Sequence, residues 1–172
     1  MTQHTPDPID ILGEAYEKMF ERAAEHFQHA EEKSLSLLHR LIDEARDEAI
    51  IMKEITRDDA DQVADYLKRD LSHANRYLAE TGHELKDWLG FETSLVETGL
   101  LDLMLKAADP TIIELNDFKE SLEQLATRHT GEITAPGILV CDKCGEKLHF
   151  HRISKVPPCP KCHGTAFHRQ SR

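Results

Sequence analysis

The sequence predicts a mainly α-helical fold, a long antiparallel helical hairpin or bundle followed by a small C-terminal β ribbon. Two observations favour helices: apolar residues recur at steps of three and four over most of the first 128 residues, and only 6% of the residues are aromatic. A third sets the end of the chain apart, because all four cysteines of this 172-residue chain fall between positions 141 and 162.

A disordered lead is expected over residues 1–8, which hold two prolines, and a helix after it. From residue 9 to residue 52 one apolar face continues without Gly or Pro after Gly13, which predicts a single helix. Its apolar stripe is narrow and needs a partner helix, as in a coiled coil. The stripe consists of Ile9, Leu12, Tyr16, Met19, Ala23, Phe27, Ala30, Ser34, Leu38, Leu41, Ala45, Ala49 and Met52.

The chain is expected to turn near residues 54–57 and then to continue in helices to about residue 128. Thr56 is a good N-cap, and Asp58 and Asp59 in the following turn complement the helix dipole. The second helix should run from Arg57 to about Glu80. Apolar patterns over 85–104 and 111–128 predict further helices, and the short links favour antiparallel neighbours. Residues 9–130 therefore form the predicted helical hairpin or bundle.

The character of the chain changes at Gly131. Residues 131–137, with Gly131, Pro136 and Gly137, are expected to be a linker, and residues 138–172 a separate ribbon. Within the ribbon, short strands are expected at residues 138–140, 148–153 and 166–169 because alternating or β-branched residues occur there.

The cysteines form two Cys-x-x-Cys pairs separated by fourteen residues, the spacing of a zinc ribbon. Zn²⁺ takes four thiolates in a tetrahedron, and a shell filled by four cysteines indicates a structural ion. A rubredoxin-like iron centre, a redox dithiol pair and plain thiols are the alternatives. The nearby His149, His151, His163 and His168 are expected to be surface residues rather than ligands. The predicted ligands of one structural zinc ion are Cys141, Cys144, Cys159 and Cys162.

Charge is unevenly distributed along the chain. Residues 136–172 carry seven Lys or Arg against two Asp or Glu, whereas residues 1–135 carry 14 against 30, so the formal charges are +5 and −16. Only the ribbon is therefore a candidate for binding nucleic acid. Phe150 and Phe167 are expected in the ribbon core rather than stacked on bases. The possible nucleic-acid contacts are Lys143, Lys147, Arg152, Lys155, Lys161 and Arg169.

Several classes of protein are disfavoured. The sequence lacks the common nucleophile-elbow, phosphate-loop, dinucleotide and zinc-protease motifs, and we expect no enzyme activity. No segment approaches the roughly 20 apolar residues of a membrane span. The first 18 residues lack the basic and apolar regions of a signal peptide, so a soluble cytoplasmic protein is expected.

Three stretches resemble the YbeL-like bacterial zinc-ribbon-containing proteins: ITRDDADQVADYLKRDL, RHTGEITAPGILVCDKC and PCPKC followed by Phe167. The resemblance implies a helical N-terminal part, a C-terminal ribbon with the four cysteines as metal ligands, and no particular reaction. The sequence departs from the family at His163, where glycine is expected directly after the last cysteine. This departure bears on the hydrogen bonds of that turn and not on the ligands.

The function predicted from these features is that of a non-catalytic adaptor that docks to proteins. One alternative is a transcription factor that associates with RNA polymerase through an acidic coiled-coil tip, formed by Asp58, Asp59 and Asp61. The other is nucleic-acid binding through the basic ribbon. The opposite charges also favour docking of the ribbon on helices, either its own or those of a second copy in a homo-oligomer. No membrane partner is expected.

Overall fold

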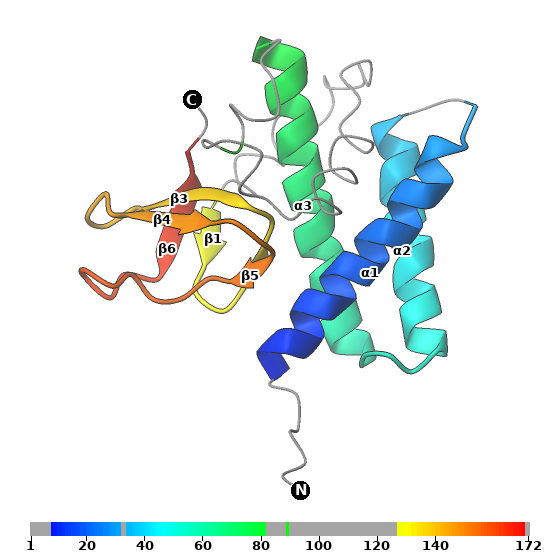
Figure 1. Cartoon of the computed structure of the whole chain (residues 1–172), viewed down its shortest axis with the longest axis horizontal. Helices are drawn as coiled ribbons and strands as arrows, with labels where there is room; N and C mark the ends of the chain where they lie inside the picture. Colours follow the sequence, from blue (N-terminus) through cyan, green and yellow to red (C-terminus); the bar gives the residue numbers. More distant parts are fainter. Residues whose placement is uncertain (1–7, 32–33, 82–88, 90–126, 171–172) are drawn as a thin grey trace, which may run out of the picture.

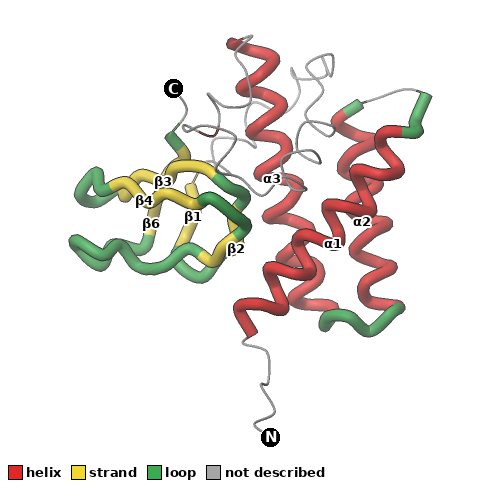
Figure 2. Tube along the Cα trace, in the orientation of Figure 1, coloured by secondary structure: helices red, strands yellow, loops and turns green. Residues whose placement is uncertain are grey.

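The computed structural model describes residues 8–31, 34–81, 89 and 127–170, which form a helical part and a β part (Figure 1). The helical part consists of α1 (Pro8–Gln28), α2 (Leu35–Ile51) and α3 (Arg57–Thr81), which run up, down and up in the view of Figure 1. The β part lies beside α3, on the side away from α2 (Figure 2). Its strands are β1 (Thr127–His129), β2 (Ile133–Thr134), β3 (Gly137–Cys141), β4 (Lys147–Phe150), β5 (Ser154–Lys155) and β6 (Ala166–Arg169).

The prediction of one helix from residue 9 to residue 52 is wrong, because the chain reverses between α1 and α2. Ser34 is in an extended conformation, with φ −139° and ψ 159°, and its hydroxyl accepts a hydrogen bond from Leu37 N at 3.1 Å, which makes it the N-cap of α2. The reversal lets the two halves of the apolar stripe pack on each other. The predicted face is buried on both helices, at Tyr16, Met19, Ala23, Phe27, Leu38, Leu41, Ala45 and Ala49.

The turn between α2 and α3 has well-defined ends. Thr56 Oγ1 accepts a hydrogen bond from Asp59 N at 3.3 Å and donates one to Asp59 Oδ2 at 2.7 Å. This reciprocal arrangement caps α3 at its N-terminus. The three described helices do not form a two-stranded coiled coil. They share one apolar core, in which α1 contacts both α2 and α3.

The predicted boundary between helices and ribbon is wrong. Residues 127–129, expected at the end of a helix, form β1 and pair with β6. Residues 131–137, expected to be a linker, include β2, which pairs with β5, and Ile133 is only 1% exposed. Gly131, with φ +99°, lies in the turn between β1 and β2, whereas Gly137 is the first residue of β3. The helices predicted over 85–104 and 111–126 lie outside the described residues, except for Leu89.

The β part contains a four-stranded antiparallel sheet in the order β1-β6-β3-β4 and a two-stranded sheet of β2 and β5. The three predicted ribbon strands are present as β3, β4 and β6. The β part has a small apolar core of its own around Leu139 and Phe167. Ile133 and Ala135, in contrast, belong to the core of the helices. The two parts therefore share apolar packing.

No helix in the described residues is both long and apolar enough to cross a membrane.

Candidate metal centre and its contact with the helices

The first cysteine pair lies on a tight turn at the end of β3. Gly145 N donates a hydrogen bond to Cys141 O at 2.8 Å, and Cys141 N donates one to Glu146 O at 2.8 Å. Gly145 has φ +73°, a conformation that glycine adopts without steric cost. These bonds fold the chain so that the sulfurs of Cys141 and Cys144 lie on the same side.

The second pair repeats this geometry. His163 N donates to Cys159 O at 2.9 Å, and Cys159 N donates to Gly164 O at 2.9 Å. His163 has φ +55° and so takes the conformation that Gly145 has in the first turn. The missing glycine therefore leaves the hydrogen bonds of the turn intact. Gly164 is needed for its size instead, because a Cβ there would lie 3.1 Å from Cys141 Sγ and 3.2 Å from Cys162 Sγ.

The four sulfurs meet between the two turns. Cys141 Sγ lies 3.6 Å from Cys162 Sγ, and Cys144 Sγ lies 3.6 Å from Cys159 Sγ. All four sulfurs lie within 4.8 Å of one another. A tetrahedron with zinc–sulfur distances of ~2.3 Å has edges of about 3.8 Å, so the arrangement fits one zinc ion. In the described part of the chain, no other group of three or more His, Cys, Asp or Glu is positioned to hold a metal.

The surroundings of the cysteines indicate a structural site. Cys141 and Cys159 are buried and belong to the apolar core of the β part, with Cys144 and Cys162 packed at its edge. Phe150 is 8% exposed and Phe167 is fully buried, so both aromatic rings are core residues as expected. Four cysteine ligands complete the shell of zinc and leave no position for a substrate.

Because His163 holds a left-handed conformation that disfavours side chains, replacing it with glycine should stabilise the zinc-loaded protein. We expect His163→Gly to raise the free energy of unfolding by about 1 kcal/mol. His163→Ala is the matched control, since alanine keeps the Cβ and should bring no comparable gain. Thermal unfolding of the zinc-loaded proteins measures the difference. Equal stability of the two variants would show that the backbone of this turn is not strained.

The predicted nucleic-acid contacts divide into exposed and buried residues. Lysine side chains project from the two cysteine turns, but Lys161 lies 3.5 Å from Glu146. Arg169 was expected on the surface and is only 6% exposed, so its assignment as a nucleic-acid contact is wrong. The exposed members of the set are Lys143, Lys147, Arg152, Lys155 and Lys161.

The four ribbon histidines are exposed and none belongs to the cysteine cluster. His168 Nδ1 lies 2.6 Å from Asp142 Oδ1, a contact between β6 and the first cysteine turn. This agrees with the expectation that His149, His151, His163 and His168 are surface residues.

The proposed acidic tip residues lie in the first turn and a half of α3. Asp59 is engaged in the cap with Thr56, and Asp61 pairs with Arg46 Nε at 3.4 Å. Asp58 is exposed. Two of the three aspartates therefore have structural partners within the helical part.

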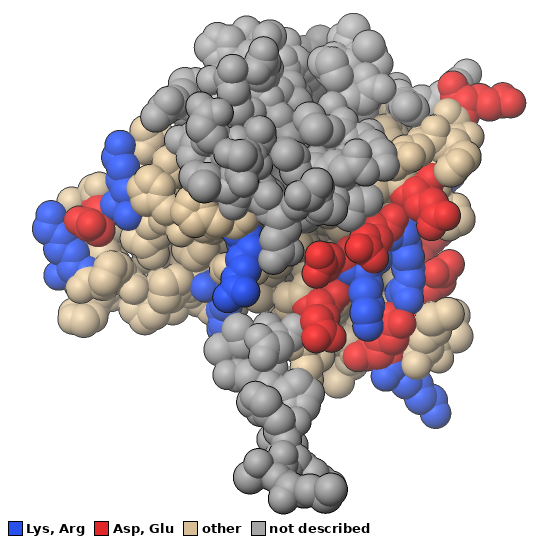
Figure 3. Space-filling model, viewed as in Figure 1, with Lys and Arg blue, Asp and Glu red and all other residues tan. Residues whose placement is uncertain are grey.

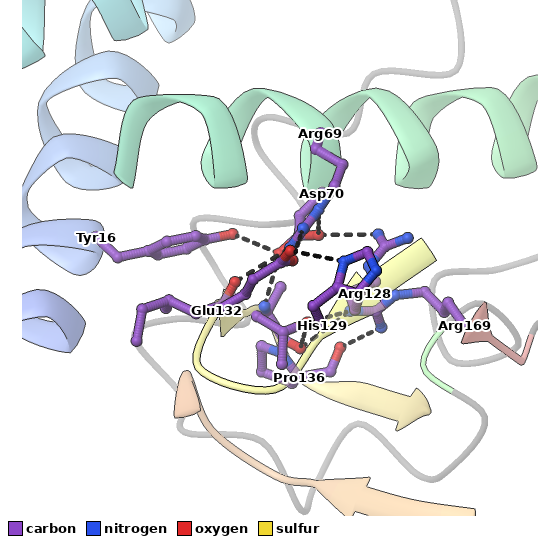
Figure 4. Close-up of polar contacts among 11 residues, drawn as sticks. Tyr16, Arg69, Asp70, Arg128, His129, Glu132, Pro136 and Arg169 are labelled. Carbon is purple, nitrogen blue, oxygen red and sulfur yellow. Dashed lines mark hydrogen bonds and ion pairs between the residues drawn. The ribbon is translucent and has the colours of Figure 1, made fainter. Parts of the chain in front are cut away.

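A buried polar network, missed by the sequence analysis, joins the helices to the β part (Figure 4). At its centre Asp70 of α3, 1% exposed, accepts hydrogen bonds from groups on four segments of the chain. Oδ1 accepts from Arg128 Nη2 of β1 at 3.0 Å and from Arg69 Nε at 3.2 Å. Oδ2 accepts from the backbone N of Ala135 at 2.8 Å and from Tyr16 Oη of α1 at 3.1 Å.

Arg69 extends the network to the chain before β2. Its Nη1 donates to Glu132, and its Nη2 donates to the carbonyl oxygen of Ile133 at 3.1 Å. Glu132 also lies 3.2 Å from His129 Nδ1. The guanidinium stacks over the ring of Tyr66, 5.1 Å from its centroid. The guanidinium of Arg69 is therefore held between α3 and the β part.

Arg169 of β6 closes the other side of the network. Its Nη1 donates to Pro136 O at 2.7 Å, and its Nη2 donates to Ala135 O at 3.0 Å and to Thr134 Oγ1 at 3.1 Å. The guanidinium lies over Gly137, where a Cβ would come within 1.7 Å of Nη1. Gly137, part of the predicted linker, is thus the position that makes room for Arg169.

Burial and charge set the pKa values in this network. Burial acts to raise the pKa of Asp70, but Arg69, Arg128 and Arg169, with the backbone N of Ala135, hold it far below its ordinary value. Burial and the Asp70 carboxylate raise the pKa of Tyr16. Burial lowers the pKa of Arg169 to about 9, against the attraction of Asp70. The carboxylate is therefore ionised at neutral pH, and it compensates charges that would otherwise be buried alone.

One signal in the sequence points to this network. Asp70 lies three residues after Leu67 and four before Ala74, on the buried face of α3. A charged pair, Arg69-Asp70, inside an apolar face indicates a buried ion pair or a contact with another part of the chain. The partners Arg128 and Arg169 carry no such signal, because each lies in a short strand that also looks like a polar surface.

Comparisons with known proteins point to the same metal centre. The family described as "Zinc-ribbon containing domain" matches residues 25–171, a span that includes the four cysteines, Asp70 and both strand arginines. The chain is 27% identical over 130 residues to "Uncharacterized protein YbeL" of Escherichia coli strain K12, an alignment that covers 76% of this chain and 80% of that protein. The YbeL proteins of strains O6:H1 and O157:H7 match equally. No solved structure matches.

Proposed function

Because the chain belongs to the family of zinc-ribbon containing domains and its four cysteines are placed for one structural zinc ion, we propose that it is a non-catalytic adaptor that docks to other proteins. The observation that carries the proposal is the buried network of Asp70. It fixes the zinc-bound β part on the helices, so that one rigid body presents two different surfaces.

The two surfaces differ in charge. Figure 3 shows acidic side chains gathered over the helices with Lys and Arg among them, whereas the charged side chains seen over the β part are mainly Lys and Arg. A rigid body of this kind meets its partners with little loss of conformational entropy, which favours specific docking. Electrostatic complementarity on each surface would then select the partners.

The same geometry makes the two alternatives weaker. Arg169 is buried in the network and Phe150 and Phe167 are buried in the core of the β part, so none of the three is available to contact a nucleic acid. A zinc ion with four thiolates also contributes two negative charges beside the exposed lysines. The acidic tip of an RNA polymerase factor would need available carboxylates, but Asp59 and Asp61 have partners within the helical part.

Cross-linking in bacterial cells that make the full-length chain tests the proposal. We expect proteins to be recovered in covalent complexes with the zinc-loaded chain, and recovery to be unchanged by nuclease treatment before cross-linked complexes are isolated. Charge reversal at Lys143, Lys147 and Lys161 should alter the recovered set, while Lys→Arg changes at the same positions serve as the matched control. Loss of all complexes after nuclease treatment, or recovery of RNA or DNA alone, would contradict the adaptor function and support nucleic-acid binding.

A further inference from the structure

We propose that the turn between α2 and α3 is a protein-docking site, at which Ile51 and Met52 insert into an apolar pocket rimmed by Lys and Arg side chains on a partner protein. We call these two residues the apolar tip. The inference rests on the adaptor function proposed above and names one of its docking surfaces.

The apolar tip is unusual in its exposure. Ile51 is 78% exposed and Met52 is 62% exposed. Among the large hydrophobic side chains of the described residues, one other is exposed, Ile11 at 38%. Single exposed apolar side chains are common on protein surfaces. Two adjacent ones at the end of α2 form a small apolar patch, and apolar patches rimmed by polar residues mark interaction sites.

The backbone beneath the tip is held in place. At the end of α2, Lys53 N donates to Ile50 O at 3.1 Å and Glu54 N donates to Ala49 O at 3.0 Å, the two hydrogen bonds of a Schellman motif. Lys53 occupies the position that glycine usually takes in this motif, with φ +56°. The chain thus keeps a long cationic side chain at this point despite its steric cost.

Arg22 of α1 fixes the tip from the side. Its guanidinium donates two hydrogen bonds to Glu54, at 2.8 and 3.1 Å, and lies 3.6 Å from Met52 Sδ. The tip is therefore attached to both α1 and α2 rather than being a loose loop. Because its shape is set in advance, docking needs little further ordering.

The charges around the tip indicate the chemistry of the partner. Six carboxylates lie at the end of α2, in the turn and at the start of α3, against four cations, Arg22, Arg46, Lys53 and Arg57, which leaves a formal net charge of −2 at this end of the helical part. Arg22 and Arg46 pair with four of the six carboxylates. A negative rim around an apolar centre is complementary to an apolar pocket with a positive rim. It repels nucleic acid and anionic membranes. The carboxylates are Asp47, Glu48, Glu54, Asp58, Asp59 and Asp61.

A photo-reactive amino acid at position 51 of the full-length, zinc-loaded chain tests the inference in bacterial cells. We expect one discrete covalent complex with another protein, whose linked residue, mapped by mass spectrometry, lies in an apolar site flanked by Lys or Arg. With the photo-reactive group moved to position 57, an exposed position beside the turn, the double change Ile51→Ser and Met52→Ser should lower the yield about tenfold, the effect of losing a central contact. Ile11→Ser is the matched control and should leave the yield unchanged.

Other outcomes would overturn the inference. For the probe at position 51, these are a yield of covalent complex no greater than that from position 44 on the exposed side of α2, a link to a second copy of this chain, or a linked site without Lys or Arg nearby. For the variants, the contradicting result is that Ile11→Ser lowers the yield as much as the double change does. The same group at position 147 of β4 separates the two proposals. Complexes from position 147 with none from position 51 leave the adaptor function standing without this docking site, and complexes from neither position contradict both.

Discussion

Replacing Asp70 with asparagine is expected to destabilise the protein by about 3–5 kcal/mol, the cost of removing one partner from a buried ion pair. Asparagine keeps the size of the side chain but not its charge, so Arg69, Arg128 and Arg169 would remain buried with too little compensation. For a chain of this length the change corresponds to a fall in Tm of roughly 10 °C. Urea unfolding followed by circular dichroism at 222 nm measures the free energy of unfolding.

Asp65→Asn is the matched control, because Asp65 is exposed on the same helix. Its effect should stay within about 0.5 kcal/mol, as for most surface substitutions. If Asp70→Asn were no more destabilising than Asp65→Asn, the network would not hold the helices and the β part together.

The same substitution should change how stability depends on pH. The pKa of Asp70 in the folded protein lies far below its ordinary value of about 3.9, so the stabilisation by its carboxylate is complete above about pH 5. It is lost as the pH falls below that value towards the folded-state pKa. The difference in unfolding free energy between wild type and Asp70→Asn should therefore shrink between about pH 5 and pH 2. A difference that stays constant over this range would contradict the assignment of an ionised Asp70.

Removal of zinc is expected to have the largest effect of all. Binding of a structural zinc ion supplies about 10–16 kcal/mol in small zinc modules, and the core of the β part is too small to replace it. We expect Cys141→Ser to unfold the β part. Because β1 and β6 supply two of the arginines around Asp70, the helices should also lose stability.

Thermal unfolding at 222 nm, with zinc content measured by elemental analysis, tests this expectation. The wild type should contain about one zinc ion per chain, as a site with four ligands requires. The helical signal of the Cys141→Ser variant should be lost at a lower temperature than that of the wild type. The His149→Ala variant, changed at an exposed position of β4, should have the melting temperature of the wild type. A variant without zinc whose helices melt as in the wild type would show that the two parts are independent.

Local patterns in the sequence were sufficient to predict the metal centre. Two Cys-x-x-Cys pairs define a complete ligand set, and alternating residues around them define short strands. Each of these signals can be recognised within a short stretch of sequence. The buried faces of α1 and α2 could likewise be predicted from the three- and four-residue spacing of their apolar residues. What the period could not reveal was the reversal at Ser34, since a stripe that continues across a turn looks the same as one on a straight helix.

The contact between the helices and the β part could not be predicted for a different reason. Asp70 and Arg169 lie about a hundred residues apart, and nothing local in the sequence of β6 separates a buried arginine from an exposed one. The opposite charges of the two regions did favour docking of the ribbon on its own helices as one of three outcomes. In the described residues, the contact consists of the buried network around Asp70 and of apolar packing by Ile133 and Ala135.

Hydrogen exchange of α3 is the most direct test of the claim that zinc binding and helix packing form one unit. Mass spectrometry would compare the amides of residues 60–74 in the wild type and in Cys141→Ser. We predict that these amides lose protection in the variant although the substitution lies in another part of the chain, since Asp70 would lose its partners in the β part. Protection of α3 that is the same in both proteins would contradict the claim.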